Sequence, residues 1–423
     1  MRYLPAILIG RLVRFAVRLV RPGGGSALPG LVLSKLAPNL VFDTLKSFKQ
    51  GLVIVTGTAG KSTTTKMIVA IVRDHGMKVF TNPTTANIEQ GFFSTIIRHG
   101  NLKGKVPGEI AILEMDEGHA ASIVEKVKPK TTVILNVFED QLDRFIDPAF
   151  VRDKLLTVAR ATTGTVLLNA DDQNCLIINA DLTGKHVDFF GISEMASEGA
   201  SGQLEYAPTF LRQIETPKAS ARVMNVAERQ IEVSINGEDS KFILPSRGIH
   251  FALDAIAALA TARDILGPSF DLARASKVLN ELPPVFSRGE IREINGESVE
   301  FILIQNPPSF QLNLDNLAND VEQIFFAIGR DVHDPSWMWT VDVSRLKRVS
   351  VVSGFNYADA ALLLAYHEIP VEVVEPDYFK AIDNFLALPK PSRGVKTVIY
   401  SADAMRRLRR YLGFTDPEDV QRG

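Results

Sequence analysis

The sequence predicts an α/β protein with a mostly parallel sheet, and three observations support this. From Gly51 onward, short apolar runs of strand length alternate with helical patterns. The first run, Leu52–Val55, leads through a glycine-rich turn into a helix rather than into a hairpin. A second series of strand-like runs begins near Pro283 and repeats the alternation. We therefore expect a larger α/β domain followed by a smaller, Rossmann-like one.

The composition fits a soluble globular protein. Of the 423 residues, 46% are hydrophobic and 23% are charged, with a formal net charge of −2. This charge gives no reason to expect a nucleic acid as the main partner. The single cysteine, Cys175, excludes an intrachain disulfide and a cysteine-cluster metal site, so no zinc is expected. It also fits a reducing cytoplasm.

Residues 1–50 predict an amphipathic helix and then a glycine/proline linker, Arg21–Gly30. The apolar run Leu4–Val20 is interrupted by arginines, so it does not predict a membrane span or a secretory signal. Helical spacing gathers the basic side chains on one face, opposite the apolar ones: Arg11, Arg14, Arg18 and Arg21. Two interpretations stay open, a helix on an anionic membrane surface or a helix packed on the protein with its arginines facing water. We slightly favour the second.

Residues 51–284 form the expected central domain. Its buried strands are expected at Leu52–Val55, Ile110–Glu114, Thr132–Asn136 and Thr165–Asn169. Helices are expected at Ser62–His75, Pro148–Ala161 and Phe251–Leu266. Short alternating runs in residues 186–245 predict an antiparallel flap or insertion, with strands at Gln230–Ile235 and Lys241–Leu244. Residues 285–423 form the second domain, with strands at Val299–Gln305, Gln323–Gly329, Arg348–Ser353, Val371–Glu375 and Thr397–Ser401.

The segment T-G-T-A-G-K-S-T-T, residues 56–64, predicts a phosphate-binding loop. Its two glycines lack Cβ atoms and can turn sharply, which brings backbone N–H groups close to a polyanion. The lysine supplies a cation, the serine supplies a hydroxyl for Mg²⁺, and the positive end of the next helix points at the same place. We expect the nucleotide to contact Gly57, Thr58, Ala59, Gly60, Lys61, Ser62 and Thr63.

Polar side chains follow three more of the expected strands. Glu114 ends one strand and is a candidate Mg²⁺ ligand, while Asp116 or Glu117 beside it can cap the next helix. Asn136 ends another strand and is expected near the nucleotide. Asp171, in N-A-D-D, is expected to meet ribose or adenine, the alternative being a helix N-terminus. Ligands bind beyond the carboxyl ends of parallel strands, so these side chains predict one site.

Five segments in this order resemble the Mur ligase family of ATP-dependent amide-forming enzymes: T-G-T-A-G-K-S-T-T, L-E-M-D-E, N-V-F-E-D-Q-L-D-R, L-N-A-D-D and S-R-G-E. Within the family, the chain looks most like the MurT-like group, whose members are synthetase subunits. The ~50 residues before the loop are too few for the UDP-binding domain that most Mur ligases carry. Q-N-P-P-S-F and D-P-S-W-M-W also resemble that group. The resemblance covers essentially the whole chain.

This resemblance implies a cytoplasmic, ATP-dependent carbon–nitrogen ligase of peptidoglycan synthesis. MurT-like enzymes use MgATP to phosphorylate the α-carboxylate of D-isoglutamate in the stem peptide of lipid II at the membrane surface. Ammonia from a GatD-like glutaminase then gives D-isoglutamine. The resemblance assigns Mg²⁺ to Ser62, Glu114 and Gln141. It brings Arg288 to the γ-phosphate, although a surface ion pair with Glu290 is the alternative. A carbamylated lysine would fall near Lys154, where the local match is loose.

The resemblance also implies that Asp334, in D-P-S-W, completes the glutaminase triad by orienting the partner's histidine. Asp331 is the fallback for this role. The alternative is that Asp334 only starts a turn at Pro335, with the two tryptophans as core or interface anchors.

Three features depart from the family pattern. Ala59 replaces an asparagine of the loop. Phe251 and Asp254 replace two asparagines, the first of which reads adenine in relatives, so nucleotide binding is in question. The four-cysteine zinc ribbon of many members has no counterpart. Two other functions therefore stay open, an amino-acid ligase of the folylpolyglutamate or polyglutamate type and a degenerate paralogue that acts as a binding subunit.

Overall fold

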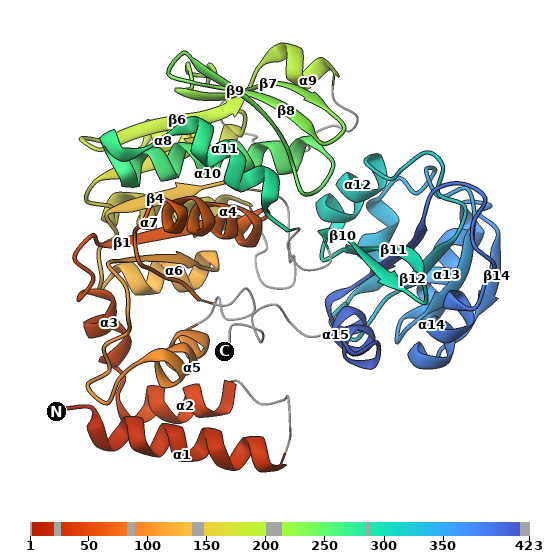
Figure 1. Cartoon of the computed structure of the whole chain (residues 1–423), viewed down its shortest axis with the longest axis horizontal. Coiled ribbons are helices and arrows are strands. Elements are labelled where there is room, and N and C mark those ends of the chain that lie inside the picture. Colours follow the sequence, from red (N-terminus) through yellow and green to blue (C-terminus); the bar gives the residue numbers. More distant parts are fainter. Residues whose placement is uncertain are drawn as a thin grey trace. The chain divides into compact units, whose positions relative to one another are not determined.

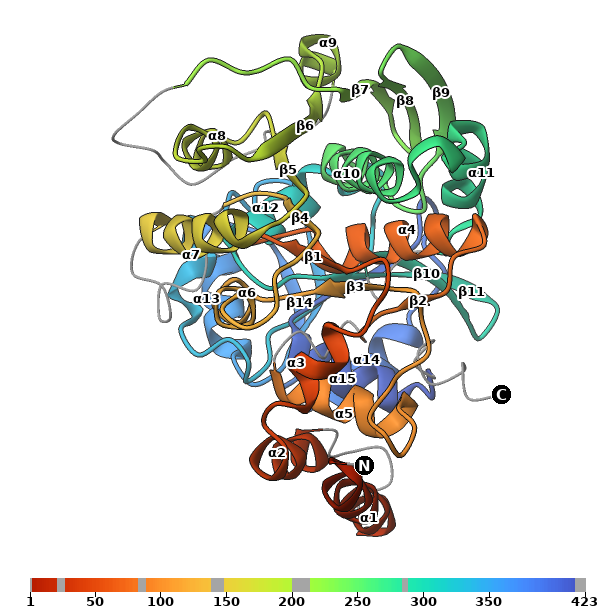
Figure 2. The same ribbon diagram turned by 90° about the vertical axis from the view of Figure 1, so that its left-hand side faces the viewer.

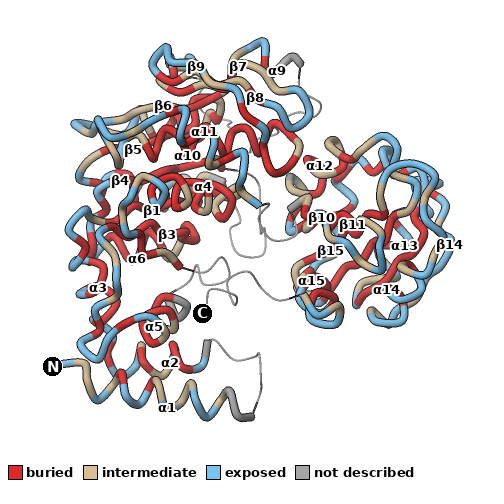
Figure 3. Tube along the Cα trace, in the orientation of Figure 1, coloured by how far each residue is buried: buried red, intermediate tan, exposed pale blue. Residues whose placement is uncertain are grey.

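A computed structural model describes residues 2–20, 27–82, 89–137, 148–199, 214–283 and 288–414. They form two compact units (Figure 1). Among the described residues, the first unit comprises 2–199, 214–244 and 250–282, and Pro245–Ile249 belongs to the second. The second continues from Pro283 to the C-terminus. The N-terminal segment is thus part of the first unit. In each unit the buried residues concentrate in the sheet and in the helix faces against it (Figure 3).

The described part of the first unit contains a nine-stranded sheet in the order β2-β3-β1-β4-β5-β6-β7-β8-β9. Neighbouring strands are parallel from β2 to β7 and antiparallel from β7 to β9. The strands are β1 Leu52–Thr56, β2 Val79–Phe80, β3 Ile110–Glu114, β4 Thr131–Ile134, β5 Thr165–Asn169, β6 His186–Ile192, β7 Ala221–Ala227, β8 Gln230–Ile235 and β9 Glu238–Ile243. The central strands are buried along their whole length, as expected of a parallel sheet covered on both faces.

Helices cover both faces of this sheet (Figure 2). One face carries α4 Lys61–Asp74 and α10 Ile249–Leu266, whereas the other carries α3 Leu40–Leu45, α5 Glu89–His99, α6 Glu117–Val124, α7 Pro148–Ala161 and α8 Gln173–Ala180. The remaining helices are α9 Glu194–Gly199, η1 Gly267–Ser269 and α11 Leu272–Glu281. Asp264 anchors α10 to the start of two strands, because its carboxylate accepts hydrogen bonds from the hydroxyls of Thr131 and Thr165 at 2.7 and 2.6 Å.

The N-terminal segment forms α1 Leu4–Val20 and α2 Ala27–Leu36, which pack with α5. The expected linker therefore ends early, since α2 starts within it. Ile7 and Leu33 belong to the same buried cluster as residues of β1 and β3. A Cβ on Gly10 would lie only 3.0 Å from the Ile97 side chain, so this glycine allows α1 to approach α5 closely. The helix packs on the protein, but not by the face that we expected, because Leu8 and Leu12 are exposed.

The described part of the second unit contains a six-stranded sheet in the order β10-β11-β15-β12-β13-β14. Only the β10–β11 pair is antiparallel. The strands are β10 Arg288–Ile294, β11 Glu297–Leu303, β12 Ile324–Ala327, β13 Val349–Ser353, β14 Val371–Val374 and β15 Lys396–Tyr400. One buried cluster lies under α12 Pro307–Asp315, η2 Pro335–Thr340 and α13 Tyr357–Tyr366, and another under α14 Tyr378–Leu386 and α15 Ala402–Tyr411.

The predicted fold class is confirmed, with a parallel sheet in the first unit and a smaller α/β unit after it. The prediction of an antiparallel flap in residues 186–245 is only partly correct. β8 and β9 are antiparallel, but β6 and β7 extend the parallel part of the main sheet. β2 and β10 were not predicted from the sequence. β2 has two residues, and β10 begins R-G-E without an apolar run.

Candidate nucleotide-binding site

The loop between β1 and α4 needs glycine at two positions. Gly57 and Gly60 have φ angles of +120° and +84°, which other residues rarely adopt. A Cβ on Gly57 would lie 2.9 Å from the carbonyl oxygen of Asn136. A Cβ on Gly60 would lie 2.1 Å from Oδ1 of Asp254. Between these close contacts the loop turns into the first turn of α4, whose N–H groups form a cradle that suits a phosphate.

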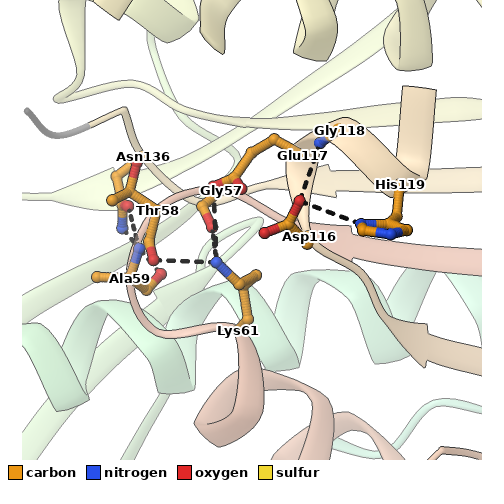
Figure 4. A network of polar contacts seen from close by, with 9 residues as sticks. All are labelled: Gly57, Thr58, Ala59, Lys61, Asp116, Glu117, Gly118, His119 and Asn136. Atoms are coloured by element: carbon orange, nitrogen blue, oxygen red, sulfur yellow. Dashed lines mark hydrogen bonds and ion pairs between the residues drawn. The ribbon is translucent and has the colours of Figure 1, made fainter. Parts of the chain in front are cut away.

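Asn136 braces this loop from the end of the neighbouring strand (Figure 4). Its Oδ1 accepts a hydrogen bond from the N–H of Ala59 at 2.8 Å, and its Nδ2 donates to the Ala59 carbonyl at 3.2 Å. Its backbone carbonyl accepts from the N–H of Thr58 at 3.1 Å. We predicted Asn136 to bind the nucleotide. In the structure its side chain contacts the loop, so an indirect role through loop shape fits these contacts best.

Lys61 lies over the loop. Its Nζ donates to the carbonyls of Gly57 and Thr58 at 2.5 and 3.0 Å (Figure 4). The same ammonium lies 3.5 Å from the buried carboxylate of Glu117, at the start of α6. Ser62 and Thr63 follow in the first turn of α4 and are buried. The ammonium, the loop N–H groups and the N-terminus of α4 converge, which is the combination that holds a polyphosphate.

Glu114 ends β3 beside Val55 of β1 and is buried. Its backbone is held on both sides by Asn82, which follows β2. The Asn82 Nδ2 donates to the Glu114 carbonyl, and the Glu114 N–H donates to the Asn82 Oδ1, both at 3.0 Å. Sequence reasoning missed Asn82. The only available indication was a polar residue directly after a very short strand.

The acidic residues after Glu114 have different positions. Asp116 caps α6, because its side chain accepts from the N–H of Gly118 at 3.2 Å, and it lies 3.5 Å from Nδ1 of His119 (Figure 4). This confirms the expectation that one residue here caps the helix. Glu117 instead faces Lys61. A nucleotide phosphate and this carboxylate would therefore compete for the same ammonium.

At the end of β5, two aspartates connect strands. The Asp171 carboxylate accepts from the N–H of Ile192 at 2.8 Å, and burial raises its pKa to about 6. Asp172 is fully buried and accepts from the N–H groups of Val137, Asn174 and Cys175. Its pKa is raised to about 7, with burial as the main cause. Asp171, predicted to bind ribose or adenine, thus makes its hydrogen bond to β6.

Phe251 and Asp254, which replace two asparagines of the family pattern, lie at the start of α10. Asp254 is buried against Gly60 and accepts a hydrogen bond from the Thr64 hydroxyl at 3.1 Å. Phe251 is buried as well, with its ring centroid 4.3 Å from that of His250. The departures thus have structural consequences. Asp254 contacts the loop side of α4, and Phe251 is packed in the protein interior rather than offered as an exposed platform for a base.

The structure does not test Gln141 or Arg288 as site residues. Gln141 lies outside the described residues. Arg288 begins β10 opposite Ile302, and its side chain also lies outside the description. Glu290, its proposed ion-pair partner, is buried and is paired with Arg292 and Arg409 at 2.6 and 2.5 Å. Lys154 lies 5.0 Å from the centre of the Phe150 ring, on α7.

Asp334 lies in the second unit and caps η2. Its side chain accepts from the N–H of Ser336 at 2.9 Å. Hydrogen bonds from the Ser336 side chain and backbone hold the pKa of Asp334 below its usual value. Its carboxylate is exposed and can meet a partner. Asp331, the fallback, has both oxygens engaged, one by the Ser401 hydroxyl and one by the N–H of Ala402 at 2.7 and 2.8 Å. The exposed Asp334 is thus the better candidate.

The comparisons with known proteins agree with this geometry. The model of the Mur ligase middle domain matches residues 55–262, and the MurT ligase C-terminal model matches residues 303–402. The chain belongs to the Mur ligase family. This family consists of ATP-dependent ligases, so the chain is an enzyme of that class. The phosphate cradle described above lies within the matched middle domain.

Curated relatives of this Mur ligase include two named as subunit MurT of lipid II isoglutaminyl synthase (glutamine-hydrolyzing). The protein of Streptococcus pneumoniae (strain ATCC BAA-255 / R6) is 26% identical, over 87% of this chain and 88% of the relative. That of Staphylococcus aureus (strain N315) is 24% identical, over 90% of this chain and 92% of the relative. Both alignments span most of each chain.

Solved structures confirm the fold. A pseudomurein peptide ligase type C from Methanothermus fervidus superposes with a TM-score of 0.68 at 16% identity, covering 89% of this chain and 80% of that chain. The MurF ligase of Thermotoga maritima, solved in complex with ADP, gives a TM-score of 0.64 at 19% identity, covering 93% and 85%. This chain shares the fold of these ligases, as the sequence resemblance predicted.

Proposed function

We propose that this Mur ligase is the synthetase subunit of a lipid II isoglutaminyl synthase. It would use MgATP and ammonia from a GatD-like glutaminase to amidate D-isoglutamate in the stem peptide. The main support for this proposal is that one chain combines the phosphate cradle at Gly57–Ser62 with a MurT-type C-terminal domain. The names of the two MurT relatives, which specify a glutamine-hydrolysing subunit, support the same function.

The residues suit this chemistry. A carboxylate oxygen attacks the γ-phosphorus, the bond to ADP breaks, and ammonia displaces phosphate from the acyl carbon with loss of a proton. Carboxylates are weak nucleophiles toward phosphate, so catalysis depends on positioning and on neutralising charge. Lys61 and the N–H groups of the loop would hold the phosphates. Ser62 and Glu114, with Gln141, would hold Mg²⁺, which supplies positive charge at the β- and γ-phosphates when bound.

Two tryptophans follow Asp334 in η2. Trp339 of η2 is exposed and lies edge-to-face with Tyr366 of α13, at 5.4 Å between ring centroids. Trp337 from the same segment is instead packed on the core, 6.2 Å from the Phe310 ring. Exposed tryptophan and tyrosine are the side chains most enriched at interface hot spots. An exposed carboxylate at the start of the same short helix suits a residue that orients a histidine of a partner.

Coexpression with a GatD-like glutaminase, followed by mass spectrometry of lipid II, tests the proposal. We expect a stem peptide in which one carboxyl has become a carboxamide. Addition of a whole amino acid would support the folylpolyglutamate-type alternative instead. No modification, with full binding of the glutaminase, would favour a binding subunit without catalysis.

Asp334→Asn should abolish glutamine-driven amidation and leave ammonia-driven amidation largely intact, because only the glutaminase triad is affected. Asp342→Asn is a matched control. Asp342 lies in the same unit, also accepts a 2.9 Å hydrogen bond from the N–H of a serine two residues on, and also has a lowered pKa because of that serine. Equal effects of both substitutions, or loss of ammonia-driven activity, would remove Asp334 from the triad.

Glu114→Ala and Lys61→Ala should abolish turnover with both nitrogen sources, because both disable the ATP chemistry. Calorimetry then separates binding from catalysis. The wild-type chain should bind MgATP and Lys61→Ala should bind it far more weakly. Equal weak binding by the two proteins would support the degenerate paralogue that the substitutions at Phe251 and Asp254 suggest.

A further inference from the structure

The N-terminal helix α1 exposes an apolar stripe that no described residue covers. Leu8, Ile9, Leu12 and Phe15 recur at helical spacing and are all exposed, Leu12 at 67% and Phe15 at 63%. They are carried by a folded helix rather than by a frayed end, because Ile7 and Gly10 on the opposite side are buried. Three leucines of the adjacent α2 are also exposed: Leu28, Leu31 and Leu36.

The arginines of α1 lie toward the protein side of this stripe. Arg11 donates to the carbonyl of Gly100, just after α5, at 2.5 Å. Arg14 also lies near α5, since its charge, with that of Arg98, adds to burial in lowering the pKa of His99. Arg11 and Arg14 are three residues apart, so they form a short arginine row on one side of the apolar stripe.

The N-terminal segment, residues 1–42, carries basic side chains and no acidic ones. Residues 1–42 contain six basic residues and no Asp or Glu, whereas the chain as a whole has a net charge of −2. The basic residues are Arg2, Arg11, Arg14, Arg18, Arg21 and Lys35. A solvent-exposed apolar stripe edged by cations fits a surface that is apolar inside and anionic outside, which describes a bilayer of anionic lipids.

We propose that α1 docks the enzyme on an anionic membrane surface, with Leu8, Leu12 and Phe15 entering the headgroup region and the arginine row contacting lipid phosphates. The helix would lie in the plane of the membrane. Across the described ranges, no helix is both long and apolar enough to cross a bilayer. A single amphipathic helix gives reversible binding that depends on its apolar area and on lipid charge.

Such docking would complement the proposed function, since a lipid-linked precursor is confined to the membrane. It does not depend on that function, because vesicle binding can be measured without catalysis. In the docked state the leucines leave water, and the arginines at the edge of the stripe reach the phosphates.

The test is cosedimentation of the full chain with vesicles of phosphatidylglycerol and phosphatidylcholine, and with vesicles of phosphatidylcholine alone. We expect binding to the anionic vesicles only, weakened by salt. The double variant Leu12→Glu/Phe15→Glu should lower the bound fraction at least tenfold without changing the melting temperature, because both side chains are exposed. Leu362→Glu is the control, since Leu362 is 60% exposed on α13 of the second unit.

Two results would overturn the proposal. One is binding to anionic vesicles that the double variant retains. The other is an absence of vesicle binding together with self-association, or glutaminase binding, that the double variant abolishes, because the stripe would then be a protein interface. Amidation of a water-soluble muropeptide distinguishes a failure of membrane docking from a failure of the proposed amidation activity. The double variant should still amidate the soluble muropeptide and should fail to amidate lipid II in vesicles. If the proposed function is wrong, the wild-type protein would amidate neither substrate.

Discussion

Replacing Asn136 with alanine should weaken binding of every polyphosphate, because the side chain shapes the loop. The substitution removes two hydrogen bonds, one from the N–H of Ala59 at 2.8 Å and one to its carbonyl at 3.2 Å. At about 1 kcal/mol each, they stabilise the phosphate-binding shape by about 2 kcal/mol. If binding must restore that shape, the dissociation constant should rise about 30-fold.

Titration calorimetry with MgATP and with inorganic tripolyphosphate distinguishes this indirect role from a direct contact. A residue that acts through the loop weakens both ligands by the same factor, since both present the same phosphates. A residue that contacts the nucleoside weakens MgATP alone. Asn280→Ala is the matched control, because the Asn280 side chain also accepts a backbone N–H, that of Ile243 at 3.1 Å, in the same unit.

The result that would refute this reasoning is a large loss of MgATP affinity in Asn136→Ala with unchanged tripolyphosphate affinity. An equal loss in Asn280→Ala would show a general effect on the stability of the unit. Unchanged affinity for both ligands would mean that the loop holds its shape through Gly57 and Thr58 alone.

Gly60→Ala should abolish MgATP binding, because the new Cβ would lie 2.1 Å from the Asp254 carboxylate and φ is +84°; calorimetry that shows full affinity would contradict this. Asn82→Ala should raise the Mg²⁺ concentration for half-maximal turnover several-fold, because both hydrogen bonds that hold the Glu114 backbone are lost; an unchanged Mg²⁺ dependence would argue against the role of Glu114. Burial raises the pKa of Asp171 to about 6, so its protonated form is stabilised in the folded state and that stability is lost as pH rises through about 6. Asp171→Asn should therefore remove about 2 kcal/mol from the change in unfolding free energy between pH 4 and pH 7; urea titrations with the same pH dependence in wild type and variant would disprove it.

Much of the fold could be predicted, because the buried strands are short apolar runs between clear boundaries. The bounds of β3, β5 and α7 agree with the prediction to the residue. The orientation of α1 could not be predicted in this way. Its spacing shows two unlike faces but does not say which one packs on the protein. Gly10 lets that side of α1 lie against α5. This contact involves Ile97, which is far from Gly10 along the chain, so the sequence of α1 alone does not reveal it.

The site shows the same limit. The phosphate-binding loop could be predicted, because its two glycines, lysine and serine are close together in the sequence and each has the chemistry that a phosphate site needs. The roles of Asn136 and Asn82 depend instead on strand order. Asn136 braces the loop because β4 lies beside β1, and Asn82 holds Glu114 because β2 pairs with β3. Polar residues at strand ends can be found in a sequence, but whether they meet a ligand or a neighbouring backbone is set by the sheet.

The brace between Asn136 and the loop also sets an order for folding. The two contacts with Ala59 join residues 77 positions apart, so the loop leaves the ribosome well before its support does. A chain that ends before β4 would contain every residue of the phosphate motif and still lack the shape that binds. Nucleotide binding therefore favours chains in which β4 has already paired with β1, and MgATP should protect the first unit against unfolding and proteolysis.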